Sequence, residues 1–292
     1  MVDWSAASKP VTGENSIWIA MLREGSDGIP KCDFTNPGTR ADATRLISEM
    51  VTSIHRRGER VLLGFDFSLG YPEGTAKALG LDTSAMPPWQ AMHEFLSRNL
   101  SDNDDNSNNR FALADLMNTK MSSRPFPFWG APRGAVTPNL SAKKSDFHAG
   151  ELEEFRVCET YFRDTQKGNP KSVWQLAYIG SVGSQSLTGI PRIRDLRAAL
   201  DRVKIWPFEF GMSEITQNAL EETSTLIVEI YPSSLNVSAQ KNEILDQAQV
   251  RAAAHFYYEL DNSGCLGRRF QAPDSLDRGK ISQIIAEEGW IL

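Results

Sequence analysis

The sequence of 292 residues is long enough for one large α/β domain or two small ones. Its net charge of −6 argues against a generally basic protein that coats nucleic acid, although a local basic groove remains compatible with it. The three cysteines lack metal-ligand spacing, and their small, odd number is typical of a reducing cytosol. The sequence has neither a signal-peptide pattern nor an apolar run of about 18 residues, so we expect a cytoplasmic protein without a membrane partner.

The first 70 residues predict three strands, a helix and a further strand. Met1–Asp3 reads as the end of a strand, and since a strand usually has about 5–6 residues, either this one is unusually short or its beginning is missing. Ser16–Leu22 and Lys31–Phe34 predict two strands joined by a turn. Arg40–Arg57 predicts an amphipathic helix, and the apolar run Val61–Phe67 predicts a buried parallel strand.

The middle of the chain, from about residue 85 to residue 170, reads as an insertion into this core. Pro87–Leu100, Arg110–Met121 and Glu151–Thr165 predict helices. Ser101–Asn109 contains no apolar residue and predicts a solvated loop. An insertion of this length usually covers or shapes a site.

The last third of the chain returns to strands and helices. Gly180–Gly189 predicts a loop of small residues, followed by a helix from Pro191 to Ala199. Val203–Phe208 and Thr225–Tyr231 predict strands, and Asn242–Leu260 predicts a long helix before an irregular tail. Because no linker or repeat divides the sequence, we expect the whole chain to form one α/β domain with insertions.

Acidic residues stand at the ends of three predicted strands. Asp3 ends the first strand, Asp66 ends the strand after the first helix, and Glu229 lies near the end of the last strong strand. Parallel neighbours place their carboxyl ends on one edge of a sheet, where open α/β sheets bind ligands. Since buried carboxylates are costly without a cation and Mg²⁺ takes carboxylate oxygens, these acids predict a metal site. Asp246, in the first turns of the last long helix, is a fourth candidate.

Each acid also has an ordinary structural explanation. Asp66 could cap the turn that follows it, Glu229 could pair with a buried arginine, and Asp246 could interact with a helix dipole. The joint placement of the strand-end acids favours the metal site. In two-metal sites, ions roughly 3.5–4 Å apart clamp the attacking and leaving oxygens of a phosphoryl transfer.

This order of elements and these residues resemble the ribonuclease H-like superfamily. The closer likeness is to a branch of predicted RNase H-like nucleases, through Gly64–Pro72 (GFDFSLGYP) and Glu229–Pro232 (EIYP). Ser172–Leu176 and Gly180–Gln185 look like segments of a bacterial subgroup often labelled with cobalamin or molybdopterin cofactor synthesis. The resemblance spans most of the chain and implies a mixed sheet of β-β-β-α-β…β-α order with helical and loop insertions.

The resemblance also implies an activity. It suggests hydrolysis of a phosphodiester by a metal-bound water, with Mg²⁺ or Mn²⁺ as cofactor and nucleic acid as partner. Carried over to this sequence, the residues that hold the metal and act in catalysis are Asp3, Asp66, Glu229 and Asp246. The usual opening strand has several residues before its aspartate, whereas only Met1 and Val2 precede Asp3 here.

Further residues are candidates for substrate binding. Between residues 189 and 204, five basic and two acidic residues give a local charge of +3. Within this segment we expect Arg192 or Arg194 to hold substrate phosphate, because arginine suits phosphate geometry. The alternative is a solvated helix face. Ser5 and Ser68, each two residues beyond a strand-end aspartate, are expected to contact substrate as well.

Two other functions stay open on the sequence. An actin-like or sugar-kinase-like ATP-binding enzyme would use an early aspartate and small hydroxyl residues, as in Asp3–Ser8, to hold ATP phosphates. Such folds usually repeat the β-β-β-α-β unit, and only one clear copy is found here. A degenerate nuclease fold could instead bind nucleic acid or a partner protein without catalysis, including a role in cofactor synthesis.

Overall fold

The computed structural model describes residues 1–25, 27–165, 167–178, 180–235 and 237–292. Its centre is a six-stranded sheet with the order β3-β2-β1-β4-β6-β5. The strands are β1 (Val2–Asp3), β2 (Trp18–Glu24), β3 (Pro30–Thr35), β4 (Val61–Phe65), β5 (Val203–Ile205) and β6 (Thr225–Glu229). β2 is antiparallel to β1 and β3, whereas β1, β4, β6 and β5 are parallel to one another. This connectivity is an RNase H-like topology, which confirms the predicted fold class.

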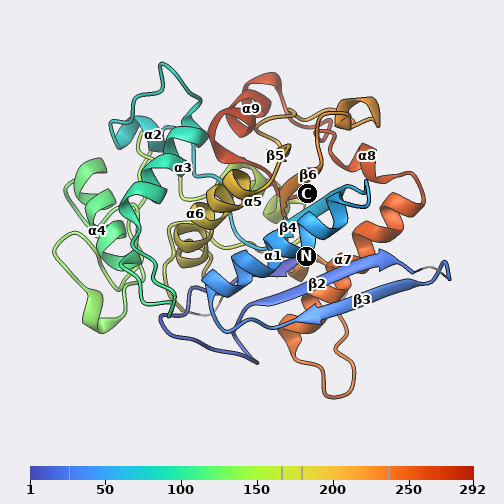
Figure 1. Ribbon diagram of the computed structural model, residues 1–292. Helices are drawn as coiled ribbons and strands as arrows, with labels where there is room; N and C mark the ends of the chain where they lie inside the picture. Colours follow the sequence, from blue (N-terminus) through green and yellow to red (C-terminus); the bar gives the residue numbers. More distant parts are fainter. Residues whose placement is uncertain (26, 166, 179, 236) are drawn as a thin grey trace.

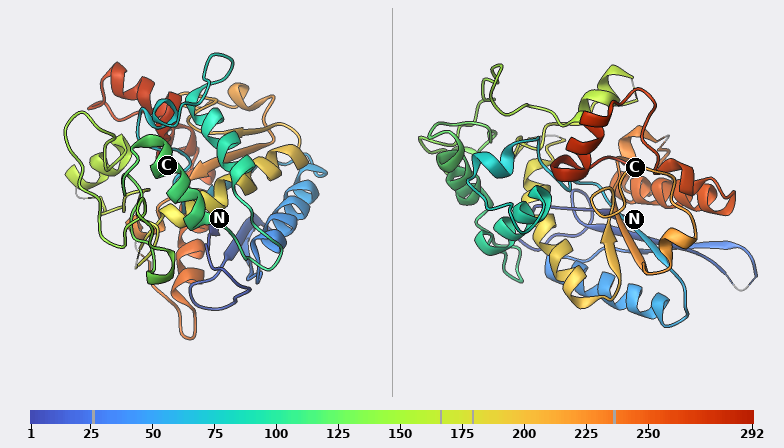
Figure 2. Two further views of the ribbon diagram at one scale, coloured as in Figure 1. Left: turned by 90° about the vertical axis from the view of Figure 1, so that its left-hand side faces the viewer. Right: turned by 90° about the horizontal axis from the view of Figure 1, so that it is seen from above.

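Helices cover both faces of the sheet (Figure 1). α1 (Arg40–His55) and α6 (Gly183–Ala199) lie on one face, and α7 (Leu245–Asn262) lies on the other, as the right-hand view of Figure 2 shows. Ile227 of β6 belongs to the same buried cluster as residues of α1 and α6, and Val228 belongs to the cluster that includes α7. β6 is therefore buried on both faces, which explains its unbroken apolar sequence.

The middle of the chain forms helices beside this core. They are α2 (Thr75–Ala78), α3 (Pro88–Asn99), α4 (Arg110–Met121), the 3₁₀ turn η1 (Arg133–Ala135) and α5 (Val157–Asp164). α2, α3 and α4 lie together at the left of Figure 1, where α3 and α4 contact α6. That this part and the sheet form a single domain stays a prediction.

The remaining short elements lie between β5 and the C-terminus. They are η2 (Asn218–Leu220), η3 (Pro232–Ser234), α8 (Leu266–Arg269), α9 (Arg278–Gln283) and the π-helical turn η4 (Ile284–Glu288). The tail after α7 is thus partly helical rather than irregular. In the ranges that the structure describes, no helix combines the length and the apolar character needed to cross a membrane.

α5 begins later than the sequence predicts. The predicted helix starts at Glu151, whereas the observed one starts at Val157. The buried Arg156 side chain donates to Glu229, 73 residues away, and the Arg156 backbone N–H donates to the Glu159 carboxylate at 2.6 Å. A bond from the backbone N–H of the residue before a helix to the glutamate three residues later fixes the first turn of the helix.

α6 begins earlier than the sequence predicts. Most of the segment Gly180–Gly189, predicted as a loop, belongs to the helix, which starts at Gly183 and contains Pro191 in its interior. A Cβ atom on Gly189 would lie only 2.2 Å from the ring of Phe67. The glycine therefore permits close packing of the helix on the segment after β4, and it does not mark a loop.

The segment Ser101–Asn109 is only partly solvated: Asn103, Asp104 and Asp105 are exposed, whereas Asn106 is buried. The Asp102 side chain is only 5% exposed and forms an ion pair with Arg40, whose side chain is fully buried. Arg40 also donates to the carbonyl oxygens of Ser5 and Ala7, at 3.1 and 2.8 Å. Arg40 is distant in sequence from Asp102, so the polar composition of the segment did not reveal that Asp102 is buried.

Candidate functional site

The carboxyl ends of β1, β4 and β6 lie at one edge of the sheet. In the parallel ladder, Val2 is opposite Phe65, and Phe65 is opposite Glu229. Asp3 follows Val2 and Asp66 follows Phe65, so the two aspartates are neighbours across the β1–β4 pair. Since side chains alternate between faces, Asp3 and Asp66 share the face opposite to that of Val2 and Phe65. The sequence-based expectation that these two aspartates come together agrees with this register.

Asp246 approaches the pair from α7. It stands in the first turn of that helix, where a negative charge is favoured by the helix dipole. Its carboxylate accepts a hydrogen bond from the backbone N–H of Asn15 at 2.7 Å. The charge of Asp246 acts on both Asp3 and Asp66, so three of the four predicted acids interact electrostatically.

The surroundings oppose the ionisation of these three acids. Burial, with the charges of Asp66 and Asp246 added, raises the pKa of Asp3 well above its usual range. Burial also raises the pKa of Asp66 to about 7, although the hydrogen bond from the Trp4 N–H opposes this shift. The pKa of Asp246 is raised as well, again chiefly by burial. The burial of these acids and the repulsion between their charges both favour binding of a cation or a proton.

Two groups hold the side chain of Asp66 in place. The Trp4 N–H donates to Asp66 Oδ1 at 2.7 Å, and Gln185 Nε2 lies 3.5 Å from Oδ2. The same amide nitrogen donates to the Trp4 carbonyl oxygen. Gln185 belongs to the first turn of α6, so this helix connects the segment after β1 to the aspartate after β4.

Glu229 has a different environment from the three aspartates. It lies one register position before Asp66, and its side chain therefore faces the other side of the sheet. Its two carboxylate oxygens accept hydrogen bonds from Arg156, at 2.8 and 2.5 Å, and the Leu69 N–H adds a third at 3.1 Å. Burial raises the pKa of Glu229, and the Arg156 guanidinium opposes that shift. This is the pairing with a buried arginine that the sequence left open, and it favours a structural role for Glu229.

A cleft of about 800 Å³ surrounds these side chains. Its lining includes all the acids and both serines predicted for the site: Asp3, Ser5, Asp66, Ser68, Glu229 and Asp246. Two cationic residues, Arg110 and Lys171, also line it. Arg110 donates to the hydroxyl of Ser8 at 2.8 Å, and burial lowers its pKa to about 10. Because that guanidinium still carries its charge at neutral pH, the cleft contains cationic as well as acidic groups.

Arg192 and Arg194 do not line the cleft. Gln185 does, and Arg192 follows seven residues later in α6, about 10 Å further along the helix axis. The Arg192 guanidinium pairs with Asp102 at 2.8 Å, and Arg194 is exposed. The structure therefore does not place these arginines where a phosphate beside the aspartates would lie. Local charge alone could not indicate this, because it does not reveal which end of the helix meets the cleft.

Two important neighbours of the site were not among the predicted residues. Arg156 has no local signal, because its partner Glu229 lies 73 residues away. Gln185 falls within the segment that resembles the bacterial subgroup, so a sequence signal existed, but nothing indicated its contact with Asp66.

The donor set suits a hard divalent cation. Asp3 and Asp66 are neighbouring carboxylates, and among the described residues no arginine or lysine forms an ion pair with either. In the same ranges, no three Asp, Glu, His or Cys side chains are grouped closely enough to hold one ion. Mg²⁺ is nevertheless usually bound through one or two carboxylates, with waters and substrate phosphates as its other ligands. The two aspartates therefore fit such an ion, with Asp246 adding negative charge.

Comparisons with protein-family models, with curated proteins and with solved structures give no match. The RNase H-like topology thus rests on the strand order and connectivity of the sheet, and any function has to be argued from the cleft.

Proposed function

We propose that the cleft binds Mg²⁺ or Mn²⁺ through Asp3 and Asp66 and hydrolyses a phosphodiester. The observation that carries this proposal is the pair of strand-end aspartates whose ionisation is opposed by burial and by mutual repulsion. A divalent cation would relieve that repulsion, because it stabilises both charges at once. The RNase H-like order of the sheet supports the same reading.

The residues of the cleft have distinct roles in this proposal. Asp3 and Asp66 would hold the metal, which when bound polarises the phosphate and lowers the pKa of a water molecule. Trp4 and Gln185 keep Asp66 in position through their hydrogen bonds. Asp246 adds negative charge to the site from α7.

Substrate phosphate would be bound by other groups of the lining. Arg110 and Lys171 replace Arg192 and Arg194 as the proposed cationic contacts, since they line the cleft. The hydroxyls of Ser5 and Ser68 would contribute hydrogen bonds from the cleft lining, as predicted for them from the sequence.

A single-stranded nucleic acid is the substrate class that we propose. Tyr178 lines the cleft and is 62% exposed, which is unusual for an aromatic side chain beside a polar site. Exposed aromatic rings next to basic groups bind bases by stacking, without strong sequence preference. Tyr178 and Lys171 both line the cleft and would bind a base and a phosphate of the substrate.

The direct test is a nuclease assay with Mn²⁺ on single- and double-stranded DNA and RNA. We expect cleavage by the wild type and a loss of at least roughly 100-fold in Asp3→Asn and in Asp66→Asn, because each variant lacks a metal-binding carboxylate. Asp104→Asn, which removes an exposed carboxylate outside the cleft, is the matched control and is expected to retain activity. Equal activity in all four proteins would refute the roles of both aspartates, and ATP hydrolysis without nuclease activity would favour the ATP-binding alternative.

A further inference from the structure

The chain leaves the sheet directly after Asp3. Asp3 is opposite Trp18 of β2, and this pair ends the ladder between β1 and β2. Residues 5–8, here called the β1 loop, lie outside the strands and helices, and Ser5, Ala6 and Ala7 of this loop line the cleft. Since the β1 loop lies beyond the ladder, its shape depends on hydrogen bonds with other parts of the chain.

The side chain of Arg40, the first residue of α1, holds two backbone carbonyls of the β1 loop. It is fully buried, and one of its nitrogens donates to the carbonyl oxygens of Ser5 and Ala7, at 3.1 and 2.8 Å. The other two nitrogens donate to the Asp102 carboxylate and to the Asn106 carbonyl. Every N–H of the guanidinium therefore has an acceptor, and this rigid planar group fixes the distance between the β1 loop and its other partners.

The segment of residues 101–109 supports Arg40 from the side of the insertion. Asn106 of this segment is only 2% exposed, and its side-chain oxygen accepts a hydrogen bond from the Arg40 backbone N–H at 2.8 Å. Its amide nitrogen donates to the carbonyl oxygens of Lys9 and Gly38, each at 3.2 Å. The segment therefore docks on both the chain that follows the β1 loop and the start of α1.

The β1 loop is in turn connected to the aspartates of the cleft. The Ser5 hydroxyl donates to the Asn15 carbonyl at 3.1 Å, and the Asn15 N–H donates to Asp246. Trp4, which precedes Ser5 in the chain, donates its backbone N–H to Asp66. A shift of the Ser5 backbone would therefore disturb the hydrogen bonds of both carboxylates.

We propose that Arg40 is a positioning residue of the metal site, which fixes the β1 loop in the conformation that metal binding requires. Arg40 and Asp102 lie outside the lining of the cleft, so Arg40 acts through the backbone of Ser5 and Ala7. This role rests on the proposed binding of a metal by Asp3 and Asp66. Groups that hold metal ligands in place typically contribute about 10–100-fold to metal affinity.

Two arginines that share one carboxylate provide matched variants. Arg40 and Arg192 both pair with Asp102, but Arg40 also bonds the β1 loop, whereas Arg192 bonds the Asp102 carbonyl. In each single variant Asp102 keeps one arginine, so its buried carboxylate is not left without a cation. Calorimetric titration of the folded proteins measures Mn²⁺ affinity directly. We expect Arg40→Met to bind Mn²⁺ at least roughly tenfold more weakly than the wild type, and Arg192→Met to stay within about threefold of it.

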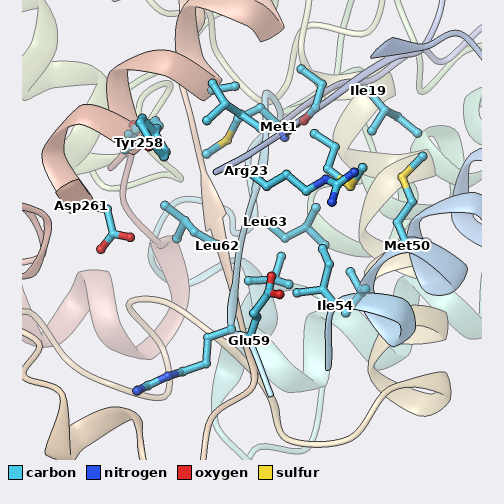
Figure 3. Close-up of a pocket in the computed structure, with 18 of the residues that line it drawn as sticks. Met1, Ile19, Arg23, Met50, Ile54, Glu59, Leu62, Leu63, Tyr258 and Asp261 are labelled. Atoms are coloured by element: carbon cyan, nitrogen blue, oxygen red, sulfur yellow. Dashed lines mark hydrogen bonds between the residues drawn. The ribbon is translucent and has the colours of Figure 1, made fainter. Parts of the chain in front are cut away.

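A further control separates metal affinity from general stability. The other end of α1 lines a separate cavity of about 380 Å³, and Figure 3 shows Met50 and Ile54 of this helix beside it. Val51 also lines that cavity and is only 3% exposed. Val51→Ala therefore destabilises the same helix far from the β1 loop, and we expect it to keep the Mn²⁺ affinity of the wild type.

Arg40→Lys gives the same comparison if Arg40→Met does not fold. Lysine keeps a positive charge beside Asp102, but its single ammonium lacks the planar fork that bonds both carbonyls of the β1 loop and the Asn106 carbonyl. We expect its Mn²⁺ affinity to fall by at least roughly threefold, because the loop is then held only in part.

Equal Mn²⁺ affinities of the wild type, Arg40→Met and Arg40→Lys would overturn the positioning role and leave the proposed function intact. An equal loss of affinity in Arg40→Met, Arg192→Met and Val51→Ala would also overturn it, because the loss would then follow from lower stability alone. If the wild type itself did not bind Mn²⁺, the proposed function would fail and the positioning role with it. The two failures are thus told apart by the wild type.

Discussion

Replacing Asp66 with asparagine is expected to stabilise the metal-free protein at pH 8 by about 2–4 kcal/mol. Burial raises the pKa of this carboxyl from 3.8 to about 7, so at pH 8 the folded state carries a charge that its surroundings oppose. Asparagine removes the charge and keeps an oxygen for the hydrogen bond from the Trp4 N–H. A substitution that removes a carboxylate of the proposed metal site would thus increase stability, as is common for acids held ready for a ligand.

The sign of this stability difference follows from the pH at which the Asp66 carboxyl binds its proton in the folded and in the unfolded state. A carboxyl whose pKa is higher in the folded than in the unfolded state binds more protons when folded between about pH 4 and pH 7. The stability that the protonated Asp66 carboxyl contributes to the folded state is therefore fully present below pH 4 and is lost as the pH rises through 7. Urea unfolding of both proteins at pH 4, 6 and 8 should show a difference that is small at pH 4 and largest at pH 8.

Other groups do not disturb this comparison. His93, whose pKa burial lowers to about 4, destabilises the folded state at acidic pH, but it does so equally in both proteins. Asp104→Asn, at an exposed site, is expected to leave stability within about 0.5 kcal/mol of the wild type at every pH. A variant Asp66→Asn that is less stable than the wild type at pH 8 would show that the carboxylate is already compensated without metal.

Replacing Arg156 with methionine is expected to lower the free energy of unfolding by about 3–5 kcal/mol. The Arg156 side chain is fully buried and pairs with Glu229 and Glu159, whose side chains are 5% and 2% exposed. It also donates to the Glu288 carbonyl at 2.8 Å and so connects the C-terminal tail to β6. Its removal would leave two buried carboxylates without a cation. Urea unfolding measures this loss.

A matched control is available on α3. Arg98 pairs with Glu94 one helical turn away, but its side chain is 72% exposed, so Arg98→Met should cost less than about 1 kcal/mol. The double variant Arg156→Met with Glu229→Gln should recover part of the lost stability, because one unpaired charge is then absent. Similar losses for Arg156→Met and Arg98→Met would contradict a central role of the buried pair.

The sequence was sufficient to predict the sheet and the proximity of two of the candidate acids. Alternating patterns and unbroken apolar runs identified the strands, and the rule that parallel strands end at one edge brought Asp3 and Asp66 together. The role of Glu229 could not be predicted in the same way. One position of register decides which face a side chain occupies, and register depends on the neighbouring strand.

Long-range contacts account for the other differences. The packing of Gly189 against Phe67 turned a predicted loop into helix α6. The pairing of Arg192 with Asp102 gave a structural role to an arginine that local charge had assigned to phosphate. Both depend on residues far apart in the chain, whose proximity arises only when the sheet is assembled.

Thermal unfolding at pH 8 with and without millimolar Mn²⁺ tests the central claim most directly. A ligand that binds the folded state at about 100 times its dissociation constant stabilises that state by about 2.7 kcal/mol. We predict a rise in melting temperature of several degrees for the wild type, none for Asp66→Asn, and a retained rise for Glu229→Gln, whose partner is Arg156. An unchanged melting temperature of the wild type, or an equal rise in Asp66→Asn, would contradict a metal site at Asp3 and Asp66.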